Sequence, residues 1–195
     1  MATWRALATV PPWPVDRLRH LPGQCRGSVV RDWATLAGPT AGVAVRAQFV
    51  RDGLQLPDVA DAAWLPAHTH LRLHDLLAEQ LCAGDRVAFG DLWLQMVAAR
   101  ISQPARWMAR QFGLQRSVAW LTAHWPSLWD VPPPSVTIGD RALVAQFAGH
   151  PLFDHPTWQW LTALQATLLL EVLVGAPVQI DAQSTAGQFA LHASW

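Results

Sequence analysis

The chain has 195 residues, enough for one domain with its own buried core. Its 14 basic and 14 acidic side chains balance, which argues against a nucleic-acid partner because such binding depends on neutralising phosphates. Two cysteines are too few for a disulfide framework, and no continuous apolar run reaches the length of a membrane-spanning helix. We therefore expect a cytoplasmic protein without a membrane span.

The first two thirds of the sequence are predicted to be helical. Residues 1–26 contain four prolines and predict an ordered arm, and residues 27–195 are predicted to form a single domain. Within that domain Gly38-Pro39 interrupts a helical pattern, while Asp85 and Ser102 are typical N-caps. Helices are expected over residues 27–37, 41–52, 69–82, a stretch after Asp85, 104–112 and 115–124.

The rest of the sequence predicts short strands around one long helix. Strands over residues 135–138 and 142–147 flank Gly139-Asp140, a two-residue hairpin signal. Asp154 or His155 is expected to cap a helix that begins at Pro156 and ends at Gly175, and strands follow over residues 178–181 and 188–194. The fold class is therefore α+β, with a helical N-terminal half followed by a small antiparallel sheet and one long packed helix.

The segment LTAHWPSLWDVPPPSVTI, residues 121–138, resembles the part of the heme nitric-oxide/oxygen-binding superfold that carries its iron-ligating histidine. The order of elements is also similar to that superfold, whose layout recurs in vinyl-4-reductase domains and TRAPP subunits. By this resemblance His124 matches the iron ligand. The family also clamps the heme propionates with a Tyr-x-Ser-x-Arg motif, and the matching residues 146–150 read QFAGH, without Tyr, Ser or Arg. We therefore expect a domain that has lost the heme.

Three short motifs are similar to a paralogous family of myxobacterial proteins of unknown function. They are GSVVR at residues 27–31, GHPLF at residues 149–153 and the final ASW.

A group of histidines is the best candidate for a metal site. His70 and His74 are four residues apart, a spacing that puts two imidazoles on one face of a helix, and His68 at the helix entrance is placed to complete a three-ligand site for a divalent metal. The alternative is a solvated helix start, since no second ligand pair follows at metal-binding spacing.

Tryptophans cluster between residues 119 and 160, where the helical half meets the sheet. Trp158 and Trp160 are two apart near a helix start, so we expect one of them to line a surface or groove. Tryptophan is favoured at binding surfaces, and plain core packing is the alternative.

We interpret the protein as a non-catalytic module that binds a hydrophobic small molecule, or a peptide added as a strand to an exposed sheet edge. Arg141 near the hairpin turn is a candidate partner for a carboxylate. A small enzyme that uses His124, His150 or His155 as acid or base is one alternative, a heme or metal sensor is another, and a homodimeric scaffold is a third. The residues expected to contact the ligand are Trp120, His124, Trp125, Trp129, Arg141, Phe147, His150, Trp158 and Trp160.

Overall fold

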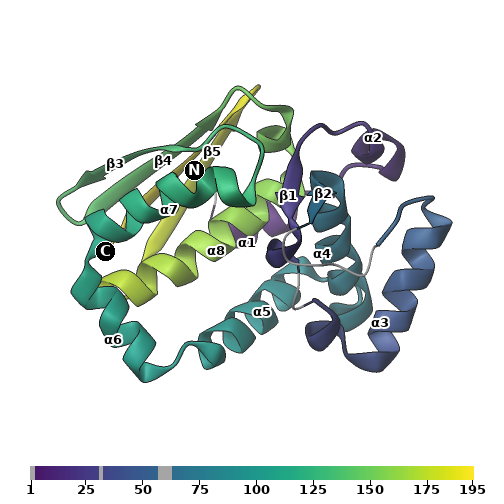
Figure 1. The fold of residues 1–195 in the computed structure, drawn as a ribbon, viewed down its shortest axis with the longest axis horizontal. Helices are drawn as coiled ribbons and strands as arrows, with labels where there is room; N and C mark the ends of the chain where they lie inside the picture. Colours follow the sequence, from purple (N-terminus) through teal and green to yellow (C-terminus); the bar gives the residue numbers. More distant parts are fainter. Residues whose placement is uncertain (1–2, 31–32, 57–62) are drawn as a thin grey trace.

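Helices come first and the sheet follows in the computed structural model, which describes residues 3–30, 33–56 and 63–195 (Figure 1). Asp85 and Ser102 cap helices as expected, because their side-chain oxygens accept hydrogen bonds from backbone N–H groups in the first turn. In the described part of the chain no helix is long and apolar enough to cross a membrane. The helices of the N-terminal half are α1 (Trp4–Ala8), α2 (Val15–Arg19), α3 (Trp33–Arg51), α4 (Ala67–Cys82), α5 (Arg86–Arg100), α6 (Gln103–Phe112) and α7 (Leu114–Leu128).

The start of the helical half differs from the predicted helix over residues 27–37. A short strand β1 (Gln24–Arg26) pairs antiparallel with β2 (Trp64–Pro66), and the Gly27 N–H donates to the carbonyl of Ala63. This pairing holds the segment in place, and the described residues that follow it form a 3-10 turn, η1 (Gly27–Val29), where a helix was expected. Residues 31–32, which include the end of the GSVVR motif, lie outside the described residues. The expected break is present at Gly38, whose φ of 66° interrupts α3.

The sheet consists of two antiparallel hairpins joined along their middle strands. Strands β3 (Ser135–Gly139) and β4 (Ala142–Ala148) form the first hairpin, and β5 (Gln179–Thr185) and β6 (Gln188–Ser194) form the second. The strand order is β3-β4-β6-β5, and β4 meets β6 with Phe147 opposite Phe189. Because side chains alternate along a strand, Phe189, Leu191 and Ala193 all face the core. The α+β prediction is confirmed.

The long helix α8 (Pro156–Val174) follows the 3-10 turn η2 (Pro151–Asp154) and lies at the centre of the molecule (Figure 1). The Nδ1 atom of His155 accepts a hydrogen bond from the Thr157 N–H at 3.1 Å, which confirms His155 as the N-cap. Helix α8 contacts α1, α4, α5, α6 and α7 as well as β5 and η2. A helix that is apolar around its whole circumference is stable only when it is covered on several sides, and α8 fits that description.

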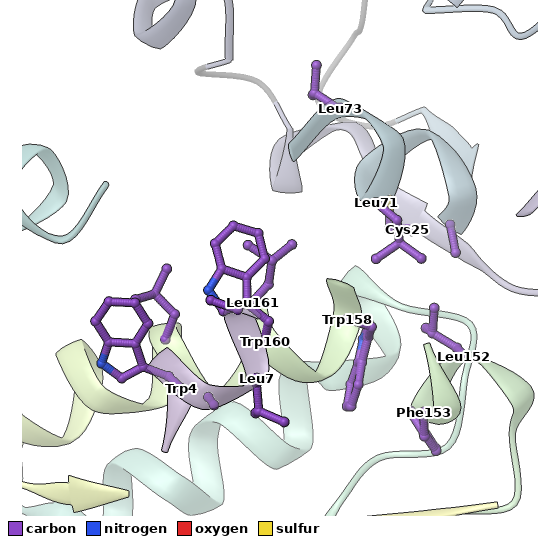
Figure 2. Packing of buried hydrophobic residues seen from close by; sticks show 14 of the residues in the cluster. Trp4, Leu7, Cys25, Leu71, Leu73, Leu152, Phe153, Trp158, Trp160 and Leu161 are labelled. Atoms are coloured by element: carbon purple, nitrogen blue, oxygen red, sulfur yellow. The ribbon is translucent and has the colours of Figure 1, made fainter. Parts of the chain in front are cut away.

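Trp158 and Trp160 belong to two different parts of this core (Figure 2). Trp158 packs toward the sheet, where the centroid of its ring lies 4.9 Å from the ring centroids of both Phe147 and Phe153. Trp160 packs toward the helices, and the centroid of its ring lies 6.0 Å from that of Phe89. Their exposed fractions are 2% and 0%, so the expectation that one of them lines a surface is wrong. The two rings do point apart, but α8 is covered on both sides.

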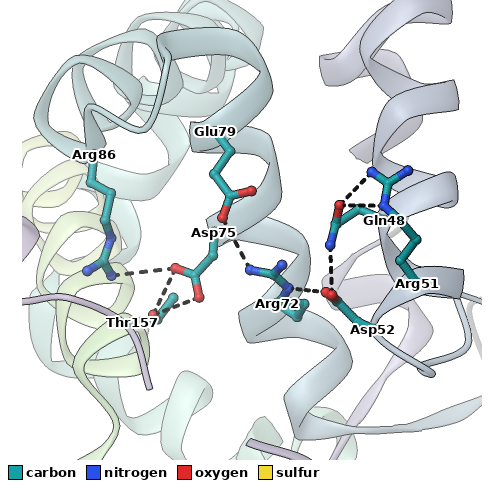
Figure 3. A network of polar contacts seen from close by, with 8 residues as sticks. All are labelled: Gln48, Arg51, Asp52, Arg72, Asp75, Glu79, Arg86 and Thr157. Carbon is teal, nitrogen blue, oxygen red and sulfur yellow. Dashed lines mark hydrogen bonds and ion pairs between the residues drawn. The ribbon is translucent and has the colours of Figure 1, made fainter. Parts of the chain in front are cut away.

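A buried polar network joins α8 to the helices of the N-terminal half (Figure 3). The Thr157 hydroxyl donates to Asp75 at 2.9 Å, and the Arg86 guanidinium lies 3.8 Å from the same carboxylate. One turn earlier in α4, Arg72 donates to Asp52 at 2.6 Å and so ties α4 to the end of α3. Burial raises the pKa of Asp75 to about 6, although Arg86 and Thr157 pull it down. The network therefore fixes the helices but buries charge at a cost.

Candidate functional site

A cavity of about 240 Å³ lies between η1, α3, α4 and α5, within the helical half. Its walls are mostly apolar and extend from the fully buried Leu77 on α4 to the exposed Arg100 at the end of α5. Binding cavities of this kind combine apolar walls with a few polar groups that orient the ligand. The described lining residues are Val29, Val30, Trp33, Leu36, His74, Leu77, Trp93, Met96, Val97 and Arg100.

His74 places a single imidazole in this cavity. The residue is 8% exposed, and its Nδ1 atom lies 2.8 Å from the carbonyl oxygen of His70, one helical turn earlier. Because a carbonyl only accepts hydrogen bonds, Nδ1 carries the proton and Nε2 presents a lone pair. Nε2 has no hydrogen-bond partner among the described residues. Burial lowers the pKa of His74, so the ring is neutral near pH 7.

The histidine pair does not form the expected three-ligand metal site. The rings of His70 and His74 are 4.4 Å apart at their centroids, and His70 also packs edge-on against Trp129. Over the described ranges no group of three or more His, Cys, Asp or Glu residues is placed to hold a metal ion, so His68 does not complete a site with the pair. The i, i+4 spacing instead places the His74 ring against the His70 carbonyl.

His124 does not fit the role of a heme ligand. It is exposed on α7, where its ring stacks on Trp120 with centroids 4.1 Å apart and its Nδ1 atom lies 2.8 Å from the Trp120 carbonyl. The core between α8 and the sheet is filled by the packed rings of Trp158, Phe147 and Phe189. To ligate a heme, the His124 imidazole would have to point into the core, and the core would need space for the heme beside it. His124 and the packed core residues therefore do not fit a heme.

The other predicted site residues fall into separate structural roles. Trp125 is half-buried and donates from Nε1 to the Val131 carbonyl at 3.0 Å, and Trp129 is buried beside it. Arg141 donates from Nε to the Trp195 carbonyl at 2.6 Å, which holds the hairpin turn. His150 accepts a hydrogen bond at Nδ1 from the Leu152 N–H at 3.1 Å. These side chains therefore support loops and turns.

Trp120 lines an apolar groove of about 650 Å³ between α6, α7 and α8. Helix α6 separates apolar from polar residues strongly around its axis, yet neither α6 nor α7 has a buried residue. The exposed fractions are 63% for Trp107, 57% for Met108, 49% for Phe112 and 52% for Trp120. Trp120 was among the predicted site residues, whereas the apolar face of α6 was not, although three large apolar residues lie within six positions of this short helix.

A second groove lies on the other side of α7, along the edge strand β3. Val118 and Thr122 of α7 face Val136 and Ile138 of β3 across it. An edge strand leaves the N–H and C=O groups of every second residue unpaired by its own sheet. Among the described strands β3 pairs with β4 alone, so its outer edge is unpaired within the sheet.

No protein-family model matches the chain, and no curated protein matches it. An H-NOX protein from S. oneidensis in the Fe(II)NO ligation state matches with a TM-score of 0.49 and 11% identity, over 87% of this chain and 98% of that one. The unliganded Fe(II) H-NOX protein from K. algicida matches with a TM-score of 0.47 and 10% identity, over 87% of this chain and 95% of that one. The structure is thus similar to H-NOX proteins at low sequence identity, and none of these comparisons bears on the myxobacterial family.

Proposed function

We propose that this protein is a non-catalytic binding module that holds a small hydrophobic molecule in the cavity between α3, α4 and α5. The observation that carries the proposal is a mostly apolar cavity lined by one buried histidine, His74, whose Nε2 has no hydrogen-bond partner among the described residues. A cavity of about 150 Å³ with apolar walls is already large enough to bind benzene. The 240 Å³ available here suits a molecule of one or two rings.

The chemistry of the lining supports binding without catalysis. An acid–base enzyme brings at least two proton-exchanging groups to one pocket. Of the described lining residues only His74 is able to exchange a proton near neutral pH, because the Arg100 guanidinium stays protonated. His124, His150 and His155 lie outside this lining.

The test is to fill the cavity and measure the loss of an apolar probe. We expect naphthalene to raise the melting temperature of the wild-type protein, because a ligand that binds only the folded state stabilises it. Val97→Phe introduces a ring from the half-buried wall of α5 and should abolish that rise. The measurement is thermal unfolding at several naphthalene concentrations.

The matched control is Val43→Phe. Val43 is 71% exposed on α3 and does not line the cavity, so this variant should respond to naphthalene as the wild type does. A wild-type protein that gains no stability from naphthalene, or a Val97→Phe variant that gains as much, would contradict the proposal.

A second candidate function is docking of a partner polypeptide in the α6–α7–α8 groove, either a peptide or a second copy of this chain. The observation in its favour is the exposed apolar face of α6, since an amphipathic helix is normally stabilised by burying that face. An exposed apolar patch of this kind is typical of an interaction surface.

Sedimentation velocity over a range of concentrations separates the two occupants. A homodimer that dissociates in Met108→Glu but persists in Val43→Glu would identify the groove as a self-association surface, because both residues are exposed but only Met108 lines the groove. If the wild-type protein is a monomer at every concentration, self-association is excluded and a peptide remains as the occupant. In that case a peptide selected on the wild type should bind Val43→Glu and lose binding to Met108→Glu, and equal binding to both would exclude the groove.

A further inference from the structure

The helical cavity has an unequal supply of hydrogen-bonding groups. Among its described lining side chains, the indoles of Trp33 and Trp93 and the guanidinium of Arg100 are donors only. Met96 contributes a thioether, which is a weak acceptor. The one strong side-chain acceptor is Nε2 of His74, and the remaining lining side chains are aliphatic.

The tautomer of His74 is fixed by the helix that carries it. The Nδ1 proton is held by the His70 carbonyl at 2.8 Å, so Nε2 remains an acceptor. Adding a proton to Nε2 would create a cation in an apolar cavity, next to a second buried imidazole at His70. A ligand that fills the cavity without offering a donor would cover this acceptor and leave it unpaired, and a donor on the ligand avoids that penalty.

We infer that the cavity selects a neutral hydrophobic molecule with one O–H or N–H donor, which is directed at His74 Nε2. This inference rests on the proposed small-molecule function and adds the chemical class of the ligand. A carboxylate is disfavoured beside His74 because the Nε2 lone pair repels it. An ammonium ion is disfavoured because the described lining has no carboxylate to pair with it.

The experiment compares indole with indene, two bicyclic probes of nearly equal shape of which only indole has an N–H donor. Dissociation constants for both are measured by titration calorimetry on the wild type, His74→Phe, His74→Gln and His20→Phe. The indole-to-indene affinity ratio should fall about threefold to tenfold in His74→Phe, the effect expected for one net hydrogen bond. Comparing ratios between variants cancels the different hydrophobicity of the two probes.

The other two variants separate the acceptor from the ring. His74→Gln keeps an acceptor oxygen and should recover part of the ratio. His20→Phe makes the same change as His74→Phe at an exposed histidine and should leave the ratio unchanged. In the wild type, the ¹⁵N resonance of His74 Nε2 should move when indole binds and stay in place with indene, a response that a merely structural histidine would not give.

The outcomes distinguish the inference from the proposed function. If both probes bind the wild type, but the ratio is the same in His74→Phe and Nε2 does not respond, the selection by a donor is wrong and the small-molecule function stands. If neither probe binds the wild type, the proposed function itself fails. Should His74→Phe not fold, the His74→Gln ratio and the wild-type ¹⁵N shift decide the question.

Discussion

His155 couples folding to pH because its imidazole is fully buried at the start of α8. Burial, and secondly the nearby charges of Arg86 and Arg17, lower the pKa of His155 to about 3. Between that value and the ordinary pKa of about 6.5 the unfolded chain holds a proton that the folded chain excludes. Stability is therefore lost as the pH falls through this window.

Replacing His155 by Asn should flatten this acid dependence. Asn is a good N-cap, so the hydrogen bond to Thr157 N–H has a substitute, but the titrating group is gone. Urea unfolding between pH 6.5 and pH 3 should show a slope lower by up to about 1.4 kcal/mol per pH unit than in the wild type. Unchanged slopes would mean that His155 is protonated in the folded state.

The raised pKa of Asp75 acts in the opposite direction. Between the ordinary value near 3.8 and the folded value of about 6, the folded chain holds a proton that the unfolded chain releases, so Asp75 adds stability as the pH falls. Burial also lowers the pKa values of His70, His74, His68 and His150, which act in the same direction as His155. We therefore expect the histidines to dominate the acid limb.

Removing Arg86 should be costly because its partner carboxylate stays buried. Arg86→Met leaves Asp75 with the Thr157 hydroxyl but without the guanidinium, and unpairing a buried ion pair costs about 3–5 kcal/mol. The loss in free energy of unfolding should be smaller at pH 5 than at pH 8, because Asp75 takes up a proton. In a double-mutant cycle with Asp75→Leu, the double variant should be more stable than Arg86→Met alone. Simple additivity would show that the two groups are uncoupled.

Two glycines in long helices should respond oppositely to the same substitution. A Cβ at Gly90 of α5 would lie 2.6 Å from Cζ3 of Trp4, so α5 and α1 approach each other as closely as they do only because residue 90 is Gly. A Cβ at Gly42 of α3 would meet no atom within 4 Å. Gly42→Ala should stabilise the protein by roughly 0.5–1 kcal/mol through helix propensity. Gly90→Ala should destabilise it by about 1 kcal/mol, since overpacking exceeds that gain.

Guanidinium unfolding of both glycine variants measures these two effects side by side. The Gly90→Ala variant should also change Trp fluorescence, because Trp4 has to move. Stabilisation by both substitutions would show that α1 adjusts to a bulkier α5 without loss of packing.

Local signals in the sequence were sufficient where the physics is local. Asp85, Ser102 and His155 act on backbone N–H groups only two or three residues away, so their capping roles follow from the sequence. The burial of both Trp158 and Trp160 does not follow from the sequence in this way. A two-residue spacing predicts the directions in which the two side chains point, but it does not predict which elements pack over them. The apolar composition around the whole of α8 was the available signal.

The helical cavity was beyond prediction for a different reason. Its lining comes from η1, α3, α4 and α5, and residues as distant as Val29 and Arg100 contribute to it. The spacing of His70 and His74 singled out this face of α4, but as a metal site and not as the wall of a cavity. The contact of His74 Nδ1 with the His70 carbonyl is local to α4, but the walls that surround the rest of the ring come from η1, α3 and α5, which a spacing rule does not contain.

At the scale of the whole molecule, the parts of the helical half depend on one another through α8. The two sides of the core meet on this helix, with Trp158 packed toward the sheet and Trp160 toward α5. A molecule organised around one central helix is expected to unfold as a single cooperative unit, without a stable half.

The central position of α8 also sets when the protein is able to fold during its synthesis. Helices α1, α4, α5, α6 and α7 are all translated before the helix against which they pack. Their apolar faces therefore wait for residues 156–174 to leave the ribosome, and the nascent chain exposes them meanwhile to chaperones and to aggregation. We expect ribosome-bound chains that end at residue 155 to be cleaved readily by protease, and chains extended past residue 195 by a linker to resist it.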